Sequence, residues 1–195
     1  MRSGEYYLGG KLLKTIETER LIMRNWKESD IFDFYEYACV EGISELTGWP
    51  PHENMEVTKG ILKDFIENDV EYALVLKETN KVIGSLGFHK RTADPNYKAD
   101  IQREIGFVLS KEYWGRGLMP EAVRAAIKYA FEEIKVDVLW VGHKSFNHQS
   151  QRVIEKSGFN FYCYGTYESF DKVYEAKKYI MTKEDYSRTL SGYHQ

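Results

Sequence analysis

A turn with two glycines joins a predicted strand to a predicted helix, and this junction limits the fold more than any other feature of the sequence. The strand covers Ile101–Leu109, and the turn is centred on Arg116, between Gly115 and Gly117. The helix begins near Pro120, which suits a first helical turn because its missing N–H would have no helical partner there. One face of that helix is apolar and consists of Ala122, Val123, Ala126, Ile127, Ala130 and Phe131. The junction therefore predicts a strand followed directly by an amphipathic helix.

The glycine turn has the chemistry of an anion site. Small residues at Gly115 and Gly117 let successive backbone amides point into one concavity, and the helix N-terminus adds about half a positive charge. Arg116 supplies a full charge, so a phosphate or pyrophosphate group would suit this turn. The segment contains neither the GxxxxGKS/T nucleotide loop nor a complete GxGxxG dinucleotide fingerprint. For the glycines taken alone, a turn that only connects strand and helix is the alternative.

The rest of the chain alternates between strand-like and helix-like periods, without a linker or an internal repeat. We expect strands near residues 18–26, 72–77, 81–90, 101–109, 138–143, 159–167 and 173–181, and helices near 31–38, 61–66, 120–131 and 149–157. This order predicts one α+β domain with a mixed sheet over residues 18–183. Residues 1–17 are expected to form an N-terminal extension and residues 184–195 a C-terminal tail.

Composition and charge exclude several function classes. The 195 residues include 27 basic and 30 acidic side chains, and the formal net charge of −3 argues against a protein that coats nucleic acid. Two distant cysteines and the lack of a signal-peptide pattern favour a reducing compartment, the cytoplasm. No run of about 18 apolar residues occurs, so we expect no membrane-spanning helix. The five histidines lack metal-ligand spacing, and we assign no metal site.

A second segment with polar residues of interest follows the strand at 138–143. If residues 149–157 are helical, Ser150 lies on the same face as Val153, Ile154 and Ser157. A hydroxyl among apolar neighbours needs a partner, because an unsatisfied buried polar group costs about 1–3 kcal/mol. A bond from Ser150 to a backbone carbonyl and a helix cap at Asn147 are the plain structural interpretations of these two residues.

Together these motifs resemble the GCN5-related N-acetyltransferase (GNAT) family, particularly the branch that includes bacterial ribosomal-protein N-terminal alanine acetyltransferases. The matching segments are ETERLIMR at Glu17–Arg24, EIGFVL at Glu104–Leu109, EYWGRGLMPEAV at Glu112–Val123, and an N-x-x-S helix ending in GF at Asn147–Phe159. The resemblance implies an α+β fold with a mixed, mostly antiparallel seven-stranded sheet, about four flanking helices and a splay at the fourth strand. It also implies an acetyltransferase that uses acetyl-CoA.

The resemblance implies which residues contact the cofactor. The family's glycine-rich turn holds the pyrophosphate of coenzyme A, and the matching residues are Trp114, Gly115, Arg116, Gly117, Leu118 and Met119. Met119 departs from the small residue of the family pattern, but a backbone amide does the binding. By similarity, the strand end Phe107, Val108 and Leu109 pairs with the pantetheine arm, and one freed amide polarises the thioester carbonyl. Asn147 matches an asparagine that contacts the cofactor.

The resemblance also implies a division of catalytic roles. Relatives often place a tyrosine late in the helix after the asparagine as general acid, but Glu155 stands at that point here. Ser150 fits the serine that takes this role in the most similar branch, with Tyr162 and Tyr164 as substitutes. Glu104 matches a glutamate of the branch and is the candidate general base through water, the alternative being a solvated strand carboxylate.

The acceptor amine stays open at this point. A lysine-like amine with a pKa of about 10.4 is only ~0.1% neutral near physiological pH, whereas an α-amine with a pKa of about 7.7–8.0 is roughly a quarter neutral. A protein N-terminus therefore needs little help from a base. The family also acetylates polyamines, antibiotics and other small amines, and a non-catalytic coenzyme A-binding module and a homodimer remain open. The loop Trp49-Pro50-Pro51 is expected to flank the acceptor.

Overall fold

The computed structural model describes residues 13–169 and 172–191, with Ser44 and Glu45 described as backbone only. Its centre is an eight-stranded sheet in the order β1-β2-β3-β4-β5-β6-β8-β7. The strands are β1 (Ile16–Glu17), β2 (Leu21–Asn25), β3 (Glu71–Leu76), β4 (Lys81–His89), β5 (Gln102–Leu109), β6 (Val138–Lys144), β7 (Asn160–Ser169) and β8 (Lys172–Thr182). All neighbouring pairs are antiparallel except β5 with β6. The expected mixed, mostly antiparallel α+β fold is confirmed.

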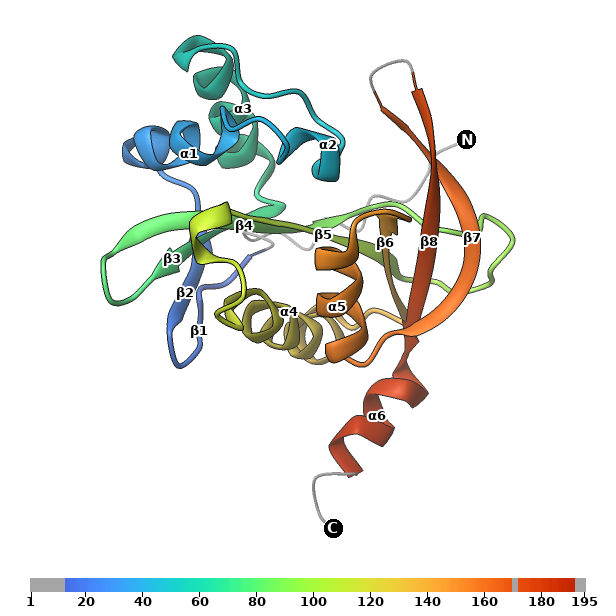
Figure 1. Cartoon of the computed structure of the whole chain (residues 1–195). Helices are drawn as coiled ribbons and strands as arrows, with labels where there is room; N and C mark the ends of the chain where they lie inside the picture. The colour runs from blue at the N-terminus through green and yellow to red at the C-terminus, as the bar shows by residue number, and fades with distance from the viewer. Residues whose placement is uncertain (1–12, 170–171, 192–195) are drawn as a thin grey trace, which may run out of the picture.

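The helices cover both faces of the sheet (Figure 1). Helices α1 (Ile31–Ala38), α2 (Ser44–Thr47) and α3 (Met55–Asn68) lie on one face, and α4 (Leu118–Tyr129) and α5 (His148–Lys156) lie on the other. Helix α6 (Lys183–Ser191) follows β8 directly, and its Tyr186 ring stacks on Phe131 with centroids 4.9 Å apart. The two helical layers define the two faces of the site described below.

Each face of the sheet has its own apolar core, because side chains alternate along every strand. In β3, Leu74 packs in the core shared with α4, whereas Ala73 and Val75 pack in the core shared with α1 and α3. All six residues of β3 are buried, as expected for a central strand covered on both faces. The centre of the sheet is therefore buried between two helical layers.

Three short or terminal elements were not expected from the sequence. Strand β1 has two residues, which is too short for an alternating pattern, and it makes the sheet eight-stranded instead of seven-stranded. Helix α2, with four residues, precedes the predicted Trp49-Pro50-Pro51 loop, and α6 occupies most of the predicted tail. Residues 1–12 of the predicted extension and 192–195 of the tail lie outside the described residues, and the domain boundaries at residues 17 and 183 stay predictions.

The parallel pair β5 and β6 separates within the sheet, as expected at the fourth predicted strand. The two strands pair only over Gln102–Glu104 and Val138–Trp140, although β5 continues to Leu109 and β6 to Lys144. Beyond Glu104 the far side of β5 has no paired strand, and this divergence opens a gap through the sheet. We call this gap the splay; it joins the two faces and positions the candidate site.

Candidate active site

Backbone groups at the end of β5 point into the splay. The Ser110 N–H donates to the Ile83 carbonyl of β4 at 2.8 Å, and the register pairs Leu109 with Gly84. Since backbone groups alternate sides along a strand, the amides of Phe107 and Leu109 face away from β4 and towards the splay. The Leu109 carbonyl accepts a bond from the Trp114 indole N–H at 2.7 Å, which fits this direction. The strand end thus offers an unpaired edge to an extended ligand.

The glycine turn after β5 has a backbone shape that favours glycine. Gly115 and Gly117 both have φ of +76°, the left-handed region where a side chain is strained. A Cβ on Gly115 would meet nothing within 4 Å, so the requirement is conformational and not steric. Gly117 is the N-cap of α4, whose first residues, Leu118 and Met119, are buried. The turn therefore delivers the amides of the helix start to the edge of the splay.

Hydrogen bonds from Thr18 and Arg20, in the connection between β1 and β2, hold this turn in place. The Arg20 guanidinium donates to the Arg116 carbonyl at 2.8 Å and to the Glu121 carboxylate at 2.7 Å. Glu121 also accepts from the Thr18 hydroxyl at 2.6 Å, and these bonds outweigh its partial burial and lower its pKa. The Arg116 guanidinium itself lies 5.1 Å from the Tyr113 ring centroid, on the surface.

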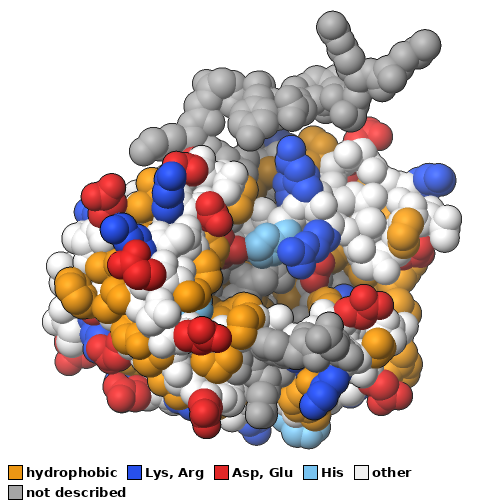
Figure 2. Space-filling model, turned by 90° about the horizontal axis from the view of Figure 1, so that it is seen from above, with side chains coloured by type: hydrophobic (Ala, Val, Ile, Leu, Met, Phe, Trp, Pro, Cys, Tyr) orange, Lys and Arg blue, Asp and Glu red, His pale blue; other side chains and the backbone are white. Residues whose placement is uncertain are grey.

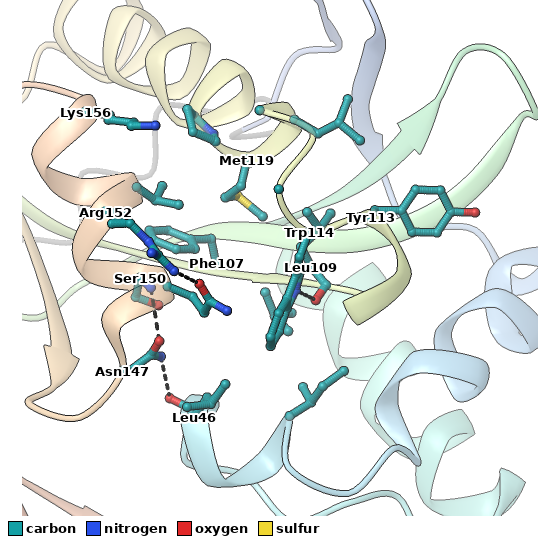
Figure 3. A pocket seen from close by; sticks show the side chains of 18 of the residues that line it. Leu46, Phe107, Leu109, Tyr113, Trp114, Met119, Asn147, Ser150, Arg152 and Lys156 are labelled. Atoms are coloured by element: carbon teal, nitrogen blue, oxygen red, sulfur yellow. Dashed lines mark hydrogen bonds between the residues drawn. The ribbon is translucent and has the colours of Figure 1, made fainter.

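A cavity of about 490 Å³ lies between the end of β5, the start of α4 and one face of α5. Figure 3 shows Phe107, Met119 and Ser150 around it, with Leu46 of α2 below. The lining residues on α5 follow helical spacing and are Gln149, Ser150, Arg152, Val153 and Lys156. Apolar side chains near the splay and two cations farther out suit a ligand with an uncharged arm and an anionic end.

Asn147 and Ser150 meet at the start of α5. Asn147 is buried and caps the helix, because its Oδ1 accepts from the Ser150 N–H at 3.0 Å. Its Nδ2 donates to the Leu46 carbonyl at 3.5 Å, so the same amide links α5 to α2 (Figure 3). The Ser150 hydroxyl lines the cavity and has no hydrogen-bond partner among the described residues. It is therefore open to a ligand atom, whereas the Asn147 amide is already used on both sides.

Glu104 does not line this cavity, and its side chain lies on the opposite face of β5 from Phe107 and Leu109. It shares a face of β5 with Gly106 and Val108, and Val108 packs in the α1–α3 core. The Tyr167 hydroxyl of β7 donates to Glu104 Oε1 at 2.9 Å. Burial and this carboxylate raise the pKa of Tyr167, so it stays a donor. A space-filling view of this side shows a hollow in which histidine, Lys and Arg side chains gather (Figure 2).

Glycines on three neighbouring strands make room for polar side chains on this face. A Cβ on Gly87 would lie 2.2–2.4 Å from the Glu71 carboxyl group, and one on Gly142 would lie 2.5 Å from the Tyr167 hydroxyl. A Cβ on Gly106 would lie 3.0 Å from His89 Nε2. Each glycine therefore serves as a socket for a titratable side chain of another residue. We call Gly87, Gly106 and Gly142 the glycine sockets.

Burial changes the protonation of Glu71 and His89, the side chains that lie against Gly87 and Gly106. Desolvation raises the pKa of Glu71 to about 8, so the carboxyl group is mostly protonated at neutral pH. Its Oε1 lies 3.2 Å from His89 Nε2, and burial lowers the pKa of that imidazole. Glu71 and His89 are therefore an uncharged pair in close contact near neutral pH.

A family model for the acetyltransferase (GNAT) domain matches residues 20–160. The chain belongs to the GNAT acetyltransferases. An uncharacterized N-acetyltransferase, p20, of Bacillus licheniformis is 24% identical over 152 residues, which is 75% of this chain and 83% of the relative. This acetyltransferase shares the fold of a GNAT-family acetyltransferase from Bacillus anthracis, with TM-score 0.79 and 23% identity over 88% of this chain and 99% of that one. It also matches a ribosomal-protein-S5-alanine acetyltransferase from Vibrio fischeri, with TM-score 0.69 and 21% identity over 88% and 98% of the two chains.

Most of the cofactor residues expected for this acetyltransferase meet at the cavity. The cofactor residues that line it are Phe107, Val108, Leu109, Trp114, Gly115, Gly117, Leu118, Met119 and Asn147, and the catalytic candidate Ser150 lines it as well. Arg116 does not line it, since its side chain lies over Tyr113. Glu104 does not line the cavity, whereas Ser150 does, so the structure does not bring the two catalytic candidates together in one cavity. Contacts of these residues with a cofactor stay predictions.

The structure places the two substitute tyrosines away from the cavity. The Tyr162 hydroxyl donates to Asp94 at 2.6 Å, and its ring packs on Trp140. Tyr164 is 72% exposed, near the outer edge of the sheet. Neither lines the cavity, so their sequence proximity to α5 does not translate into proximity to Ser150.

The Trp49 loop packs on the core of the α1–α3 layer. The Trp49 ring lies 5.2 Å from the His52 ring, and the Gly48 carbonyl accepts from the Ser169 hydroxyl of β7 at 3.0 Å. The loop and the end of β7 thus meet beside the Glu104 face. A role for Trp49 in acceptor binding stays a prediction.

Sequence reasoning missed several residues of this acetyltransferase's site. Arg152 and Lys156 lie four residues apart on the cavity face of α5, and their spacing with Ser150 and Val153 was a usable signal. Tyr167 and Lys178 come from β7 and β8 and carry no motif. Within residues 13–169 and 172–191, no cluster of three or more metal-ligating side chains is found, and no helix is long and apolar enough to cross a membrane.

Proposed function

We propose that this acetyltransferase moves the acetyl group of acetyl-CoA directly to a primary amine held on the Glu104 face. The observation that supports this most is the splay itself. It lies between the cavity beside the glycine turn and the face of β5 that carries Glu104. Donor and acceptor can therefore bind together and react through the sheet, without a covalent enzyme intermediate.

The cavity has the features that acetyl-CoA requires. The amides at the start of α4 and the turn Gly115–Met119 suit the pyrophosphate, and Arg152 and Lys156 add positive charge for the phosphates. The amides of Phe107 and Leu109 suit a pantetheine arm that pairs like a strand. Asn147 positions Ser150 and α2 around this arm.

The proposed reaction has one bond-forming step. The neutral amine nitrogen attacks the thioester carbonyl carbon, a C–N bond forms and the C–S bond breaks. A β5 amide donor stabilises the oxyanion while it exists. The amine proton passes through water to Glu104. The departing thiolate accepts a hydrogen bond from the Ser150 hydroxyl and takes its proton from solvent, so Ser150 keeps its own proton. The products are an N-acetylated amine and coenzyme A.

We propose a peptide N-terminal α-amine as the acceptor. Such an amine is partly neutral at physiological pH, so a carboxylate acting through water suffices as base. The Vibrio fischeri structure named as a ribosomal-protein alanine acetyltransferase supports the same class by its fold. The competing functions are an acetyltransferase for small amines and a non-catalytic coenzyme A-binding module.

We also propose that the protein acts in the cytoplasm. Cys39 and Cys163 are both free thiols, which suits a reducing compartment.

Calorimetry and a thiol-release assay test this proposal together. We expect a single acetyl-CoA site, and turnover with some member of a panel of peptides and small amines. Arg152→Glu should weaken acetyl-CoA binding more than Arg116→Glu, because only Arg152 lines the cavity. Binding without turnover on any amine would favour the non-catalytic module, and no binding in low salt would contradict both functions.

A further inference from the structure

Lys178 of β8 is fixed beside the splay on the Glu104 face. Its Nζ lies 3.4 Å from the Tyr167 ring centroid, and its Cδ lies 2.9 Å from the position that a Cβ on Gly142 would take. Gly142 comes two residues after Trp140, the last β6 residue that pairs with β5. The ammonium group is therefore held at the mouth of the gap through which an amine must reach the thioester.

The Lys178 ammonium has no anion bound to it within the described part of the chain. No carboxylate lies within 4.0 Å of its Nζ there, and it makes no hydrogen bond with a described residue. Burial lowers the pKa of Lys178, and the charge of Glu104 acts in the opposite direction. A half-buried cation that rests on an aromatic face leaves its donors available for an incoming anion.

A second cation, Arg91, acts on the group of side chains around Lys178. The Glu71 carboxyl group, with a pKa of about 8, is mostly protonated at neutral pH and does not offset this positive charge. Arg91 acts electrostatically on Glu71, Tyr167 and Lys178. A polycationic acceptor would be repelled here, whereas an anion beside the amine would be attracted.

We infer that the acceptor is a primary amine with a carboxylate or another anionic group close to it, and that Lys178 binds this group while Glu104 faces the amine. The inference rests on the proposed function, because it concerns the acceptor of the same reaction. Two sources share this chemistry: a free amino acid and a peptide whose N-terminal residues are acidic. In both, the reacting amine and the anion belong to one molecule, which matches the adjacent Glu104 and Lys178.

Matched acceptors test the inference. Peptides with Asp or with Lys directly after the N-terminal residue differ only in charge, and a free amino acid differs from its decarboxylated amine only in the carboxylate. We expect a kcat/KM about tenfold or more higher for the anionic member of at least one pair, with the difference reduced by added salt. The pair that responds identifies the source of the anion.

Variants of two adjacent lysines assign the effect to one side chain. Lys178→Met should remove the preference by raising KM for the anionic acceptor about tenfold, with acetyl-CoA affinity close to wild type. Lys177→Met makes the same chemical change on the other face of β8, where Lys177 Nζ lies 3.5 Å from Gln151. Lys177→Met should keep the preference.

Other outcomes contradict specific statements. Transfer that favours polyamines or neutral amines, or a preference that survives Lys178→Met, would overturn the inference and leave the proposed function standing. Absence of transfer to every amine would contradict the proposed function instead. In that case, calorimetry of the same acceptors with the coenzyme A complex still tests the anion site. Tighter binding of the anionic acceptor, lost in Lys178→Met, would support the site. Equal binding of the two acceptors would overturn it.

Discussion

The two faces of the sheet at the splay are built in different ways. The α4–α5 face presents backbone amides, glycines in a left-handed conformation and a cavity that is mostly apolar near the gap. The Glu104 face presents titratable side chains that lie across glycine sockets of neighbouring strands. The first face comes from segments that are continuous in sequence, and the second from single residues of β3, β4, β5, β7 and β8.

This difference has a functional meaning. A glycine turn and a helix N-terminus bind phosphate groups through backbone amides, so this binding does not depend on which acceptor is used. Side chains can be exchanged one at a time, so the face made of side chains is where acceptor choice and proton transfer can vary. We expect variants of the two faces to separate cofactor binding from acceptor use.

The largest effect is expected for Glu104→Gln. The kcat/KM at about pH 7 should fall by about 10²–10⁴-fold with acetyl-CoA affinity unchanged, because a proton acceptor is lost. The loss should shrink towards about pH 8–9, where an α-amine deprotonates without help. A pH–rate profile measures this, and an unchanged kcat/KM at neutral pH would reject Glu104 as base.

Ser150→Ala tests the other face with the same assay. We expect kcat and kcat/KM to fall together by about 10²-fold. Deprotonation of the amine at high pH should not restore this loss, because the hydroxyl acts on the thiolate. Ser157→Ala is the control, since its hydroxyl bonds the Val153 carbonyl at 2.8 Å within the same helix. Equal losses in both variants would point to damage to α5.

Glu71→Gln should stabilise the protein at neutral pH. The carboxyl group has an ordinary pKa of 4.5 and one of about 8 when folded, so between these values the folded chain holds a proton that the unfolded chain has released. The free energy of unfolding of wild type therefore falls as pH rises from about 4.5 to about 8. The variant should lack this slope and gain about 2–4 kcal/mol at pH 7.5, measured by denaturant unfolding across pH. Parallel profiles for the two proteins would contradict the buried, protonated state.

Two glycine substitutions should separate the faces. Gly142→Ala places a Cβ 2.5 Å from the Tyr167 hydroxyl, so it should disturb the bond to Glu104 and lower kcat/KM for the acceptor about tenfold. Gly117→Ala forces a side chain into a left-handed conformation and should instead weaken acetyl-CoA binding, with a stability loss of about 1–2 kcal/mol. Gly165→Ala is the control, because its nearest contact would be an ordinary 3.7 Å. If both variants changed only acetyl-CoA binding, or only kcat/KM for the acceptor, the two faces would not have separate roles.

The smallest effect is expected for Trp114→Phe. It removes the indole bond to the Leu109 carbonyl and should lower stability by about 0.5–1.5 kcal/mol, a fall in Tm of a few degrees. Acetyl-CoA affinity should fall slightly as the strand end loses its support. Trp49→Phe removes an indole that makes no hydrogen bond with a described residue, so its Tm should change less. A larger fall in Trp49→Phe would assign the effect to ring size.

The sequence alone determined most of the elements and the glycine turn and helix start beside the cavity. Alternation over Ile101–Leu109, the two glycines and the apolar stripe after Pro120 are local signals, and the structure has β5, the left-handed turn and α4 in those places. The Asn147 cap followed from helix-start chemistry in the same way. Short-range sequence patterns indicate backbone geometry. They therefore predict the turn and the helix start, whose backbone groups face the cavity.

Only the tertiary structure decided the acceptor side. Tyr167 lies on the edge strand β7, and it reaches Glu104 because β7 and β8 bring it over Gly142 of β6. The order β6-β8-β7 and the register that places Lys178 opposite Gly142 depend on contacts between distant segments, which no local period encodes. Burial then set the protonation of Glu71, since desolvation exists only once the layers have packed.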